Sequence, residues 1–108
     1  GSTAYSLSCG GPIIMPGSGN FVITPISPHN LNVRPIVVNE NMTLRLEIES
    51  RTEKYILSCD SKSHTLSTKT SLTITKAPFS INLIRLQNDQ YFGILREKLL
   101  WGIDVRNY

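Results

Sequence analysis

Residues 1–12 read GSTAYSLSCGGP, a stretch that predicts a short helix closed by a tight turn. Ser2 or Thr3 is suited to the N-cap, because a side-chain hydroxyl accepts a hydrogen bond from a free N–H of the first turn. Residues 4–9 then form about two turns, and the glycines at 10 and 11 end the helix before Pro12. The free N–H groups and the helix dipole favour an anionic or hydroxyl-rich ligand. On spacing alone, a connecting helix without a ligand is the alternative.

Beyond this stretch, short extended segments separated by turn residues predict a mainly β domain, specifically a β-sandwich. The segments are 21–24, 36–38, 42–49, 54–59, 64–69, 71–75 and 79–86. The connection 25–35 contains three prolines, which exclude a central strand there. An ordered loop of about ten residues in a compact domain is usually functional.

The clearest strand is 42–49, where apolar and polar side chains alternate. Residues 51–53 connect it to 54–59, so these two segments are predicted to pair in an antiparallel ladder. Residues 60–63 have the composition of a turn.

The tail is predicted to be an amphipathic helix, with Asp89 as its N-cap and Gly102 as its C-cap. Its apolar stripe follows the helical period. The residues of that stripe are Tyr91, Phe92, Ile94, Leu95, Leu99 and Trp101, together with the stem of Lys98. With such a helix at each end, the expected architecture is a β domain flanked by two short helices.

Composition limits the possible functions. The chain has 108 residues and a net charge of +3, and its basic residues alternate with acidic ones, which argues against a nucleic-acid-binding stripe. The sequence contains neither a secretory signal nor a transmembrane run, so we expect a cytoplasmic protein in which Cys9 and Cys59 stay reduced. Because the sequence begins without Met, we expect a piece of a longer protein.

Three segments in order resemble the NAD kinase family. Residues 1–12 resemble its TGSTAYxLSxGGP motif; TPISPHNL at 24–31 with RPIV at 34–37 resembles TPxxPHxLxxRPxV; and Cys59-Asp60-Ser61 resembles a strand end often written CDG or CDS. The resemblance implies the C-terminal, NAD-binding and oligomerising domain of a bacterial-type NAD kinase. That enzyme transfers the terminal phosphoryl of ATP to the 2′-hydroxyl of the adenosine ribose of NAD, with Mg²⁺ as the divalent metal.

The family's catalytic machinery is not in this sequence. Its Gly-Gly-Asp-Gly motif, whose Asp is taken as the base, and its Asn-Glu pair, which holds NAD, are both expected upstream in an N-terminal domain. Phosphoryl transfer also needs a phosphate cradle, and the sequence has no glycine-rich phosphate loop. We therefore expect no catalytic residue and no metal ligand here, inactivity of the 108 residues alone, and a homo-oligomeric full enzyme.

The resemblance also implies which residues contact NAD. They are Thr3, Ala4, Tyr5 and Ser8 in the first motif, Ser27 in the proline-rich loop, and Asp60 near the reacting ribose. Three of them have a purely structural alternative: Tyr5 as a core residue, Ser8 bonded back to a helix carbonyl, and Asp60 as a turn former. His29 is expected to be a structural loop residue and His64 a surface residue.

Two functions of other classes remain open on the sequence. A stand-alone β-sandwich interaction module fits the strands, although it does not explain why the motifs occur together and in order. A lipid-kinase relative would share the architecture, although it would lack the signature of residues 3–5 and would need a more basic pocket.

Overall fold

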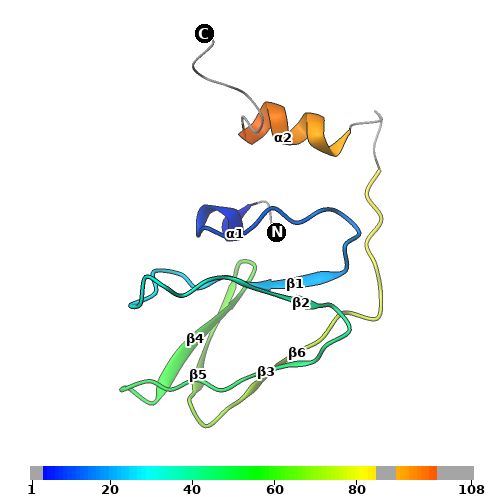
Figure 1. Ribbon diagram of the computed structural model, residues 1–108. Helices are drawn as coiled ribbons and strands as arrows, with labels where there is room; N and C mark the ends of the chain where they lie inside the picture. Colours follow the sequence, from blue (N-terminus) through cyan, green and yellow to red (C-terminus); the bar gives the residue numbers. More distant parts are fainter. Residues whose placement is uncertain (1–3, 85–89, 100–108) are drawn as a thin grey trace. The chain divides into compact units, whose positions relative to one another are not determined.

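The computed structural model describes residues 4–84 and 90–99 and contains six strands and two helices (Figure 1). In chain order these are α1 (Tyr5–Ser8), β1 (Asn20–Ile23), β2 (Ile36–Asn39), β3 (Leu44–Leu46), β4 (Lys54–Cys59), β5 (Lys62–Ser67), β6 (Leu72–Ile74) and α2 (Tyr91–Leu99). The chain divides into two compact units, Gly1–Pro78 and Phe79–Tyr108. The prediction of a mainly β fold with a short helix towards each end is confirmed.

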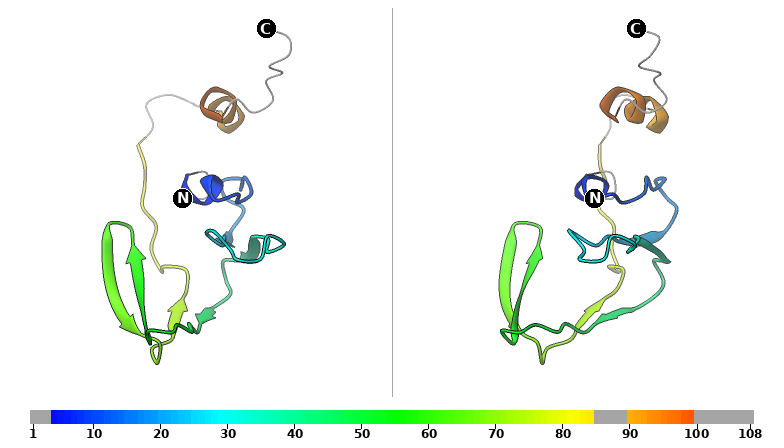
Figure 2. Two further views of the ribbon diagram at one scale, coloured as in Figure 1. Left: turned by 90° about the vertical axis from the view of Figure 1, so that its left-hand side faces the viewer. Right: turned by 60° about the vertical axis from the view of Figure 1, so that its left-hand side comes forward.

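Within the first unit the strands pair as three separate two-stranded antiparallel sheets: β1 with β2, β3 with β6, and β4 with β5. The β4–β5 hairpin, drawn in green, has the longest ladder, running from the pair Lys54–Ser67 to the pair Cys59–Lys62 (Figure 2). A turn of two residues, Asp60 and Ser61, joins its strands. The turn predicted from residue 60 onward is therefore confirmed, and it is tighter than expected.

The predicted pairing of 42–49 with 54–59 is wrong. The two-residue turn at Asp60 pairs β4 directly with β5, and β4 has no second partner among the described strands. β3 pairs instead with β6, in a register that joins Leu44 to Ile74 and Leu46 to Leu72. β3 is also shorter than predicted, because a ladder cannot extend beyond its shorter partner and β6 has three residues.

The connection between β1 and β2 is an ordered loop without strand structure, as predicted. The Asn32 N–H donates a hydrogen bond to Asn30 Oδ1 at 2.9 Å, and the Arg34 guanidinium donates to the Leu31 carbonyl at 3.1 Å. Local bonds of this kind satisfy backbone groups that the prolines exclude from a ladder. The loop is thus held by its own side chains.

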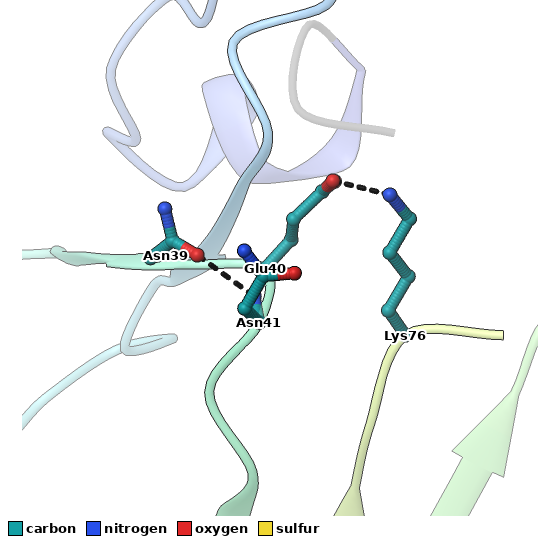
Figure 3. Close-up of polar contacts among 4 residues, drawn as sticks. All are labelled: Asn39, Glu40, Asn41 and Lys76. Atoms are coloured by element: carbon teal, nitrogen blue, oxygen red, sulfur yellow. Dashed lines mark hydrogen bonds and ion pairs between the residues drawn. The ribbon is translucent and has the colours of Figure 1, made fainter.

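Two of the three sheets are linked by an ion pair that follows directly on β2. The Glu40 N–H donates to the Gly19 carbonyl at 2.9 Å, and the Asn41 N–H donates to Asn39 Oδ1 at 2.8 Å. This turn holds the Glu40 carboxylate against the ammonium of Lys76, two residues beyond β6 (Figure 3). The Glu40 side chain is 29% exposed, so water screens the pair only in part.

The second unit contains less regular structure than predicted. Residues 79–84 form no strand, so the strand expected at 79–86 is wrong over its described part; residues 85–86 lie outside the described residues. α2 confirms the predicted tail helix, with the rings of Tyr91 and Phe92 packed edge to face. Both predicted caps, Asp89 and Gly102, and the stripe residue Trp101 lie outside the described part of the chain.

Little apolar surface is buried within residues 4–84 and 90–99. Among its described apolar side chains, Leu95 of α2 is the one that is buried, with 4% exposed. Isoleucines and leucines on the strands and in the following segment stay open, Ile56 at 72% and Leu83 at 80%. Contiguous apolar surface beyond a few hundred Å² rarely remains bare in a soluble protein.

We expect Glu40→Gln to destabilise the full-length protein by about 0.5–1 kcal/mol, because it removes a partly screened ion pair that links two sheets. The exposed pair Arg45–Glu47, whose side chains are 68% and 76% exposed, is the matched control, and Glu47→Gln should change stability by less than about 0.3 kcal/mol. Thermal unfolding of both variants at low and high salt measures this. Equal effects of the two substitutions would show that the Glu40 contact has no special role.

Candidate functional site

The first motif folds into α1 and the turn that follows it. α1 has four residues, and its N-cap is Ala4, whose methyl group cannot accept a hydrogen bond. The N-cap predicted at Ser2 or Thr3 is therefore wrong in position; both residues lie outside the described ones. A single turn sums few peptide dipoles, so the dipole argument for an anion at this helix loses its force. The exposed side chains of the segment are therefore its main feature for a ligand.

Ser8 is bonded back to its own helix. Its hydroxyl donates to the Ala4 carbonyl at 3.3 Å, and its N–H donates to the same oxygen at 3.2 Å. This is the hydrogen bond to a helix carbonyl that was given as the structural alternative for Ser8. Because the hydroxyl oxygen keeps its acceptor capacity and Ser8 is exposed, the residue still has a polar atom on the surface.

Tyr5 is on the outside of α1. It is 67% exposed, so the alternative that it is a core residue is wrong for this chain. An open phenol beside the exposed Ala4 presents both a flat aromatic face and a hydrogen-bonding group. These are the features with which a protein holds a ribose or a base.

The turn after α1 depends on two adjacent glycines. Gly10 has φ of +84°, a conformation that L side chains adopt rarely, and its N–H donates to the Leu7 carbonyl at 3.0 Å. Gly11 is buried, and its N–H donates to the Ser6 carbonyl at 2.8 Å. A Cβ at position 11 would lie 2.3 Å from Ser6 Oγ. The prediction that glycines end the helix is confirmed. Gly10 is required by its positive φ angle, and Gly11 is required by the lack of space for a Cβ.

A pair of hydroxyl groups brings two of the motif segments together. Ser6 Oγ and Thr24 Oγ1 are 2.7 Å apart in a partly buried contact, which holds α1 at the end of β1, where the proline-rich loop begins. Sequence reasoning singled out neither residue as functional. Thr24 is the first residue of the second motif, whereas Ser6 falls at a variable position of the first motif, and a hydroxyl pair 18 positions apart follows no spacing rule.

Ser27 and Asp60 share an unusual backbone. Ser27 has φ of +47° and Asp60 has φ of +52°, and both residues are exposed. Ser27 is in the loop that Thr24 begins. Asp60 is on a different sheet, at the turn of the β4–β5 hairpin, where Ser58 Oγ and Ser63 Oγ close the strand ends at 2.8 Å. Aspartate is among the residues that tolerate this region, which fits Asp60 as a turn former.

The hollows of the surface do not coincide with these residues. One hollow of about 480 Å³ lies along the β4–β5 hairpin, and none of the five predicted contact residues that the structure describes lines it. Its lining residues are Thr52, Glu53, Lys54, Thr65, Leu66, Ser67 and Lys69. The described residues among the six, which are Ala4, Tyr5, Ser8, Ser27 and Asp60, are all exposed.

Other chemistry is limited within the described residues. No group of three or more His, Cys, Asp and Glu side chains is placed to hold a metal ion in 4–84 and 90–99. The thiols of Cys9 and Cys59 are free, as expected. Neither described helix has the length and apolar character needed to cross a membrane.

Residues 1–86 match the family model described as the ATP-NAD kinase C-terminal domain. The chain belongs to this family. Among its relatives, the NAD kinase of Christiangramia forsetii is 50% identical over 107 residues, which are 99% of this chain and 36% of that protein. The NAD kinase of Cytophaga hutchinsonii is 50% identical over 99% of the chain, and that of Bacteroides fragilis is 47% identical over 98%.

The chain spans 36% to 37% of the length of these relatives. The family match covers α1, all six strands and residues 79–84, and it ends before α2. All three motif segments that resemble the family lie inside the matched range. The alternatives of a stand-alone interaction module and of a lipid-kinase relative give way to this membership.

The backbone at Asp60 leads to a stability prediction for the full-length protein. Asp60→Asn should leave the melting temperature nearly unchanged, because Asn adopts positive φ about as readily. Asp60→Ala should cost about 1 kcal/mol, because Ala lacks both that tolerance and the local hydrogen bonds. Thermal unfolding compares them, with Asp60→Gly as the control that restores the backbone freedom. A stable Ala variant would mean that the turn does not depend on this residue.

Proposed function

We propose that the full-length protein is an NAD kinase that transfers the terminal phosphoryl group of ATP to the 2′-hydroxyl of the adenosine ribose of NAD, forming NADP. The observation that carries this proposal is the match of residues 1–86 to the family, together with relatives of about 50% identity that are named NAD kinases. The motif of residues 1–12 supports it, since its exposed residues suit a dinucleotide.

The part of the enzyme in this chain holds and orients NAD. Tyr5 supplies an aromatic face for a ribose or base and a phenol for a hydrogen bond, as its exposure allows. The hydroxyls of Thr3 and Ser8 bond ribose hydroxyls or the nicotinamide amide. Ala4 keeps the approach to the backbone open, and the backbone of Ser27 contacts the dinucleotide from the proline-rich loop.

Asp60 acts at the reacting ribose. A carboxylate accepts hydrogen bonds from ribose hydroxyls and fixes the orientation of the sugar. Its exposure at the hairpin turn leaves the carboxylate open to a ligand, which supports this role. Orientation contributes much of the rate of phosphoryl transfer, because that reaction depends on positioning and charge stabilisation.

The remaining components lie outside this sequence. We place the Asp of the Gly-Gly-Asp-Gly motif and the Asn-Glu pair in an N-terminal domain of the same polypeptide, which also binds ATP. The described residues offer no cluster that fits the divalent metal, Mg²⁺, so no step at the metal is assigned to them. A cytoplasmic location accords with the substrates.

We further propose that the full enzyme is a homo-oligomer. Support comes from the apolar side chains that this chain leaves open, among them Leu31, Ile56 and Ile84, which are 86%, 72% and 92% exposed. Leu99 of α2, which is 40% exposed, is expected to contribute to the contact, together with residues 100 and 101 beyond the described helix. Symmetric self-association is the commonest way to cover such a surface.

The test is to incubate the purified full-length protein with ATP, Mg²⁺ and NAD and to measure NADP with an NADP-specific dehydrogenase. Formation of NADP that depends on both substrates supports the proposal. A protein that is folded and binds ATP yet phosphorylates diacylglycerol and not NAD would refute it.

In the full-length enzyme, Tyr5→Ala is expected to raise KM for NAD by about ten- to a hundredfold, because one stacked, hydrogen-bonding ring contributes roughly 1–3 kcal/mol. Tyr5→Phe keeps the ring and should raise KM by less than about tenfold. Steady-state kinetics with NAD as the varied substrate measure both. An unchanged KM in the Ala variant, at any melting temperature, would exclude Tyr5 from the NAD site.

The role of Asp60 has a separate kinetic signature. Asp60→Asn should lower kcat by at least about tenfold, because the amide carries no charge and half the acceptor capacity of the carboxylate. Single-turnover formation of NADP, compared with the melting temperature of the same sample, separates chemistry from folding. A fully active Asn variant would assign Asp60 to the turn alone.

A further inference from the structure

Ser6 and Tyr5 are neighbours on α1 that face different ways. Tyr5 and Ser8 are exposed, whereas Ser6 is half-buried and its hydroxyl lies 2.7 Å from that of Thr24. This side-chain contact therefore connects the inner side of α1 to the end of β1. The outer side, with the residues proposed to contact NAD, remains free.

Ser6 is also fixed from its other side by Gly11. The Gly11 N–H donates to the Ser6 carbonyl at 2.8 Å, and a Cβ on Gly11 would lie 2.3 Å from Ser6 Oγ and 2.7 Å from Ser6 O. Real Cβ atoms do not approach other atoms that closely. The serine hydroxyl is thus confined between a glycine that just accommodates it and the hydroxyl that it meets.

Thr24 is a rigid partner. It follows the last residue of β1 and precedes Pro25, which restricts its backbone to extended conformations. Its β-branched side chain has few χ1 rotamers. Three residues later the chain reaches Ser27, whose φ of +47° reorients the loop. The position of Thr24 therefore sets where the Ser27 loop starts.

We propose that Ser6 and Thr24 form a positioning pair that sets the spacing between α1 and the Ser27 loop, and that NAD affinity depends on this spacing. The inference rests on the proposed function, since both segments are proposed to contact NAD. Neither hydroxyl touches the dinucleotide. A dinucleotide held at two segments loses affinity when one shifts against the other, because its contacts can no longer all form together.

The energetics give the pair a distinctive signature. Removing one hydroxyl leaves the other partly buried without its partner, which costs more than the bond itself contributed. Replacing both by apolar groups of similar shape costs less than the two single changes combined. Thr24→Ser keeps a hydroxyl at the same place and serves as the conservative variant.

The experiment compares five variants of the full-length enzyme with the wild type: Ser6→Ala, Thr24→Val, the double variant, Thr24→Ser and Ser50→Ala. Ser50→Ala is the matched control, because Ser50 Oγ meets Thr52 Oγ1 at 3.1 Å in an exposed local contact. KM for NAD, KM for ATP, kcat and the melting temperature are measured for each.

We expect each single variant of the pair to raise KM for NAD by about three- to tenfold, while KM for ATP and kcat stay within about twofold of the wild type. The double variant should lie well below the product of the two single effects, and Thr24→Ser and Ser50→Ala should match the wild type. Falling melting temperatures with unchanged KM for NAD would overturn the inference and leave the pair merely structural. A wild type that forms no NADP would instead refute the proposed function, and this role with it.

Discussion

Backbone hydrogen-bond ladders, and not a buried apolar core, hold the described strands together. Each sheet has two strands, and an isolated two-stranded sheet is marginally stable in water. With Leu95 as the buried apolar residue of the described set, the sheets depend on the few contacts that join them. The Glu40–Lys76 ion pair connects β2 to β6, and the Ser6–Thr24 pair connects α1 to β1. A chain built in this way relies on further surface to cover its apolar faces, which agrees with its coverage of 36% of its relatives.

The candidate site, like the sheets, is held by few contacts. Its residues are held by short local structures: a single helical turn, a glycine pair, a loop with side-chain hydrogen bonds of Asn30 and Arg34, and a two-residue hairpin turn. Such structures fix backbone positions without requiring a large core, and they leave the side chains of Tyr5 and Asp60 exposed. A dinucleotide is long and polar, so an open surface of this kind suits it once a second domain closes the other side. In the proposed function, this chain orients NAD and the catalytic groups come from elsewhere in the polypeptide.

Sequence reasoning predicted the mainly β fold, both helices and most strand positions, because alternation and turn composition are local signals. Strand pairing was predicted wrongly, since alternation reports which face is apolar and not which strand is adjacent. The turn at Asp60 indicates the observed pairing, because a two-residue connection joins strands that pair with each other. A strand was also expected at 79–86, and its described part has no ladder partner among the described residues. Ser6 and Thr24 were missed because only the folded chain brings them together.

The adjacent glycines after α1 differ in how they constrain the evolution of the sequence. At Gly10 the positive φ angle restricts which residues fit, and the space around the position is open. Asn tolerates such an angle, so a Gly10→Asn substitution costs little stability. At Gly11 the limit is volume, with Ser6 atoms where the first carbon of any side chain would go. Even alanine, the smallest residue with a side chain, would clash at this position. Replacing Ser6 by a smaller residue would remove the clash with its hydroxyl but not the clash with its backbone oxygen. Position 10 can therefore accept substitutions that position 11 cannot, although both residues are glycines.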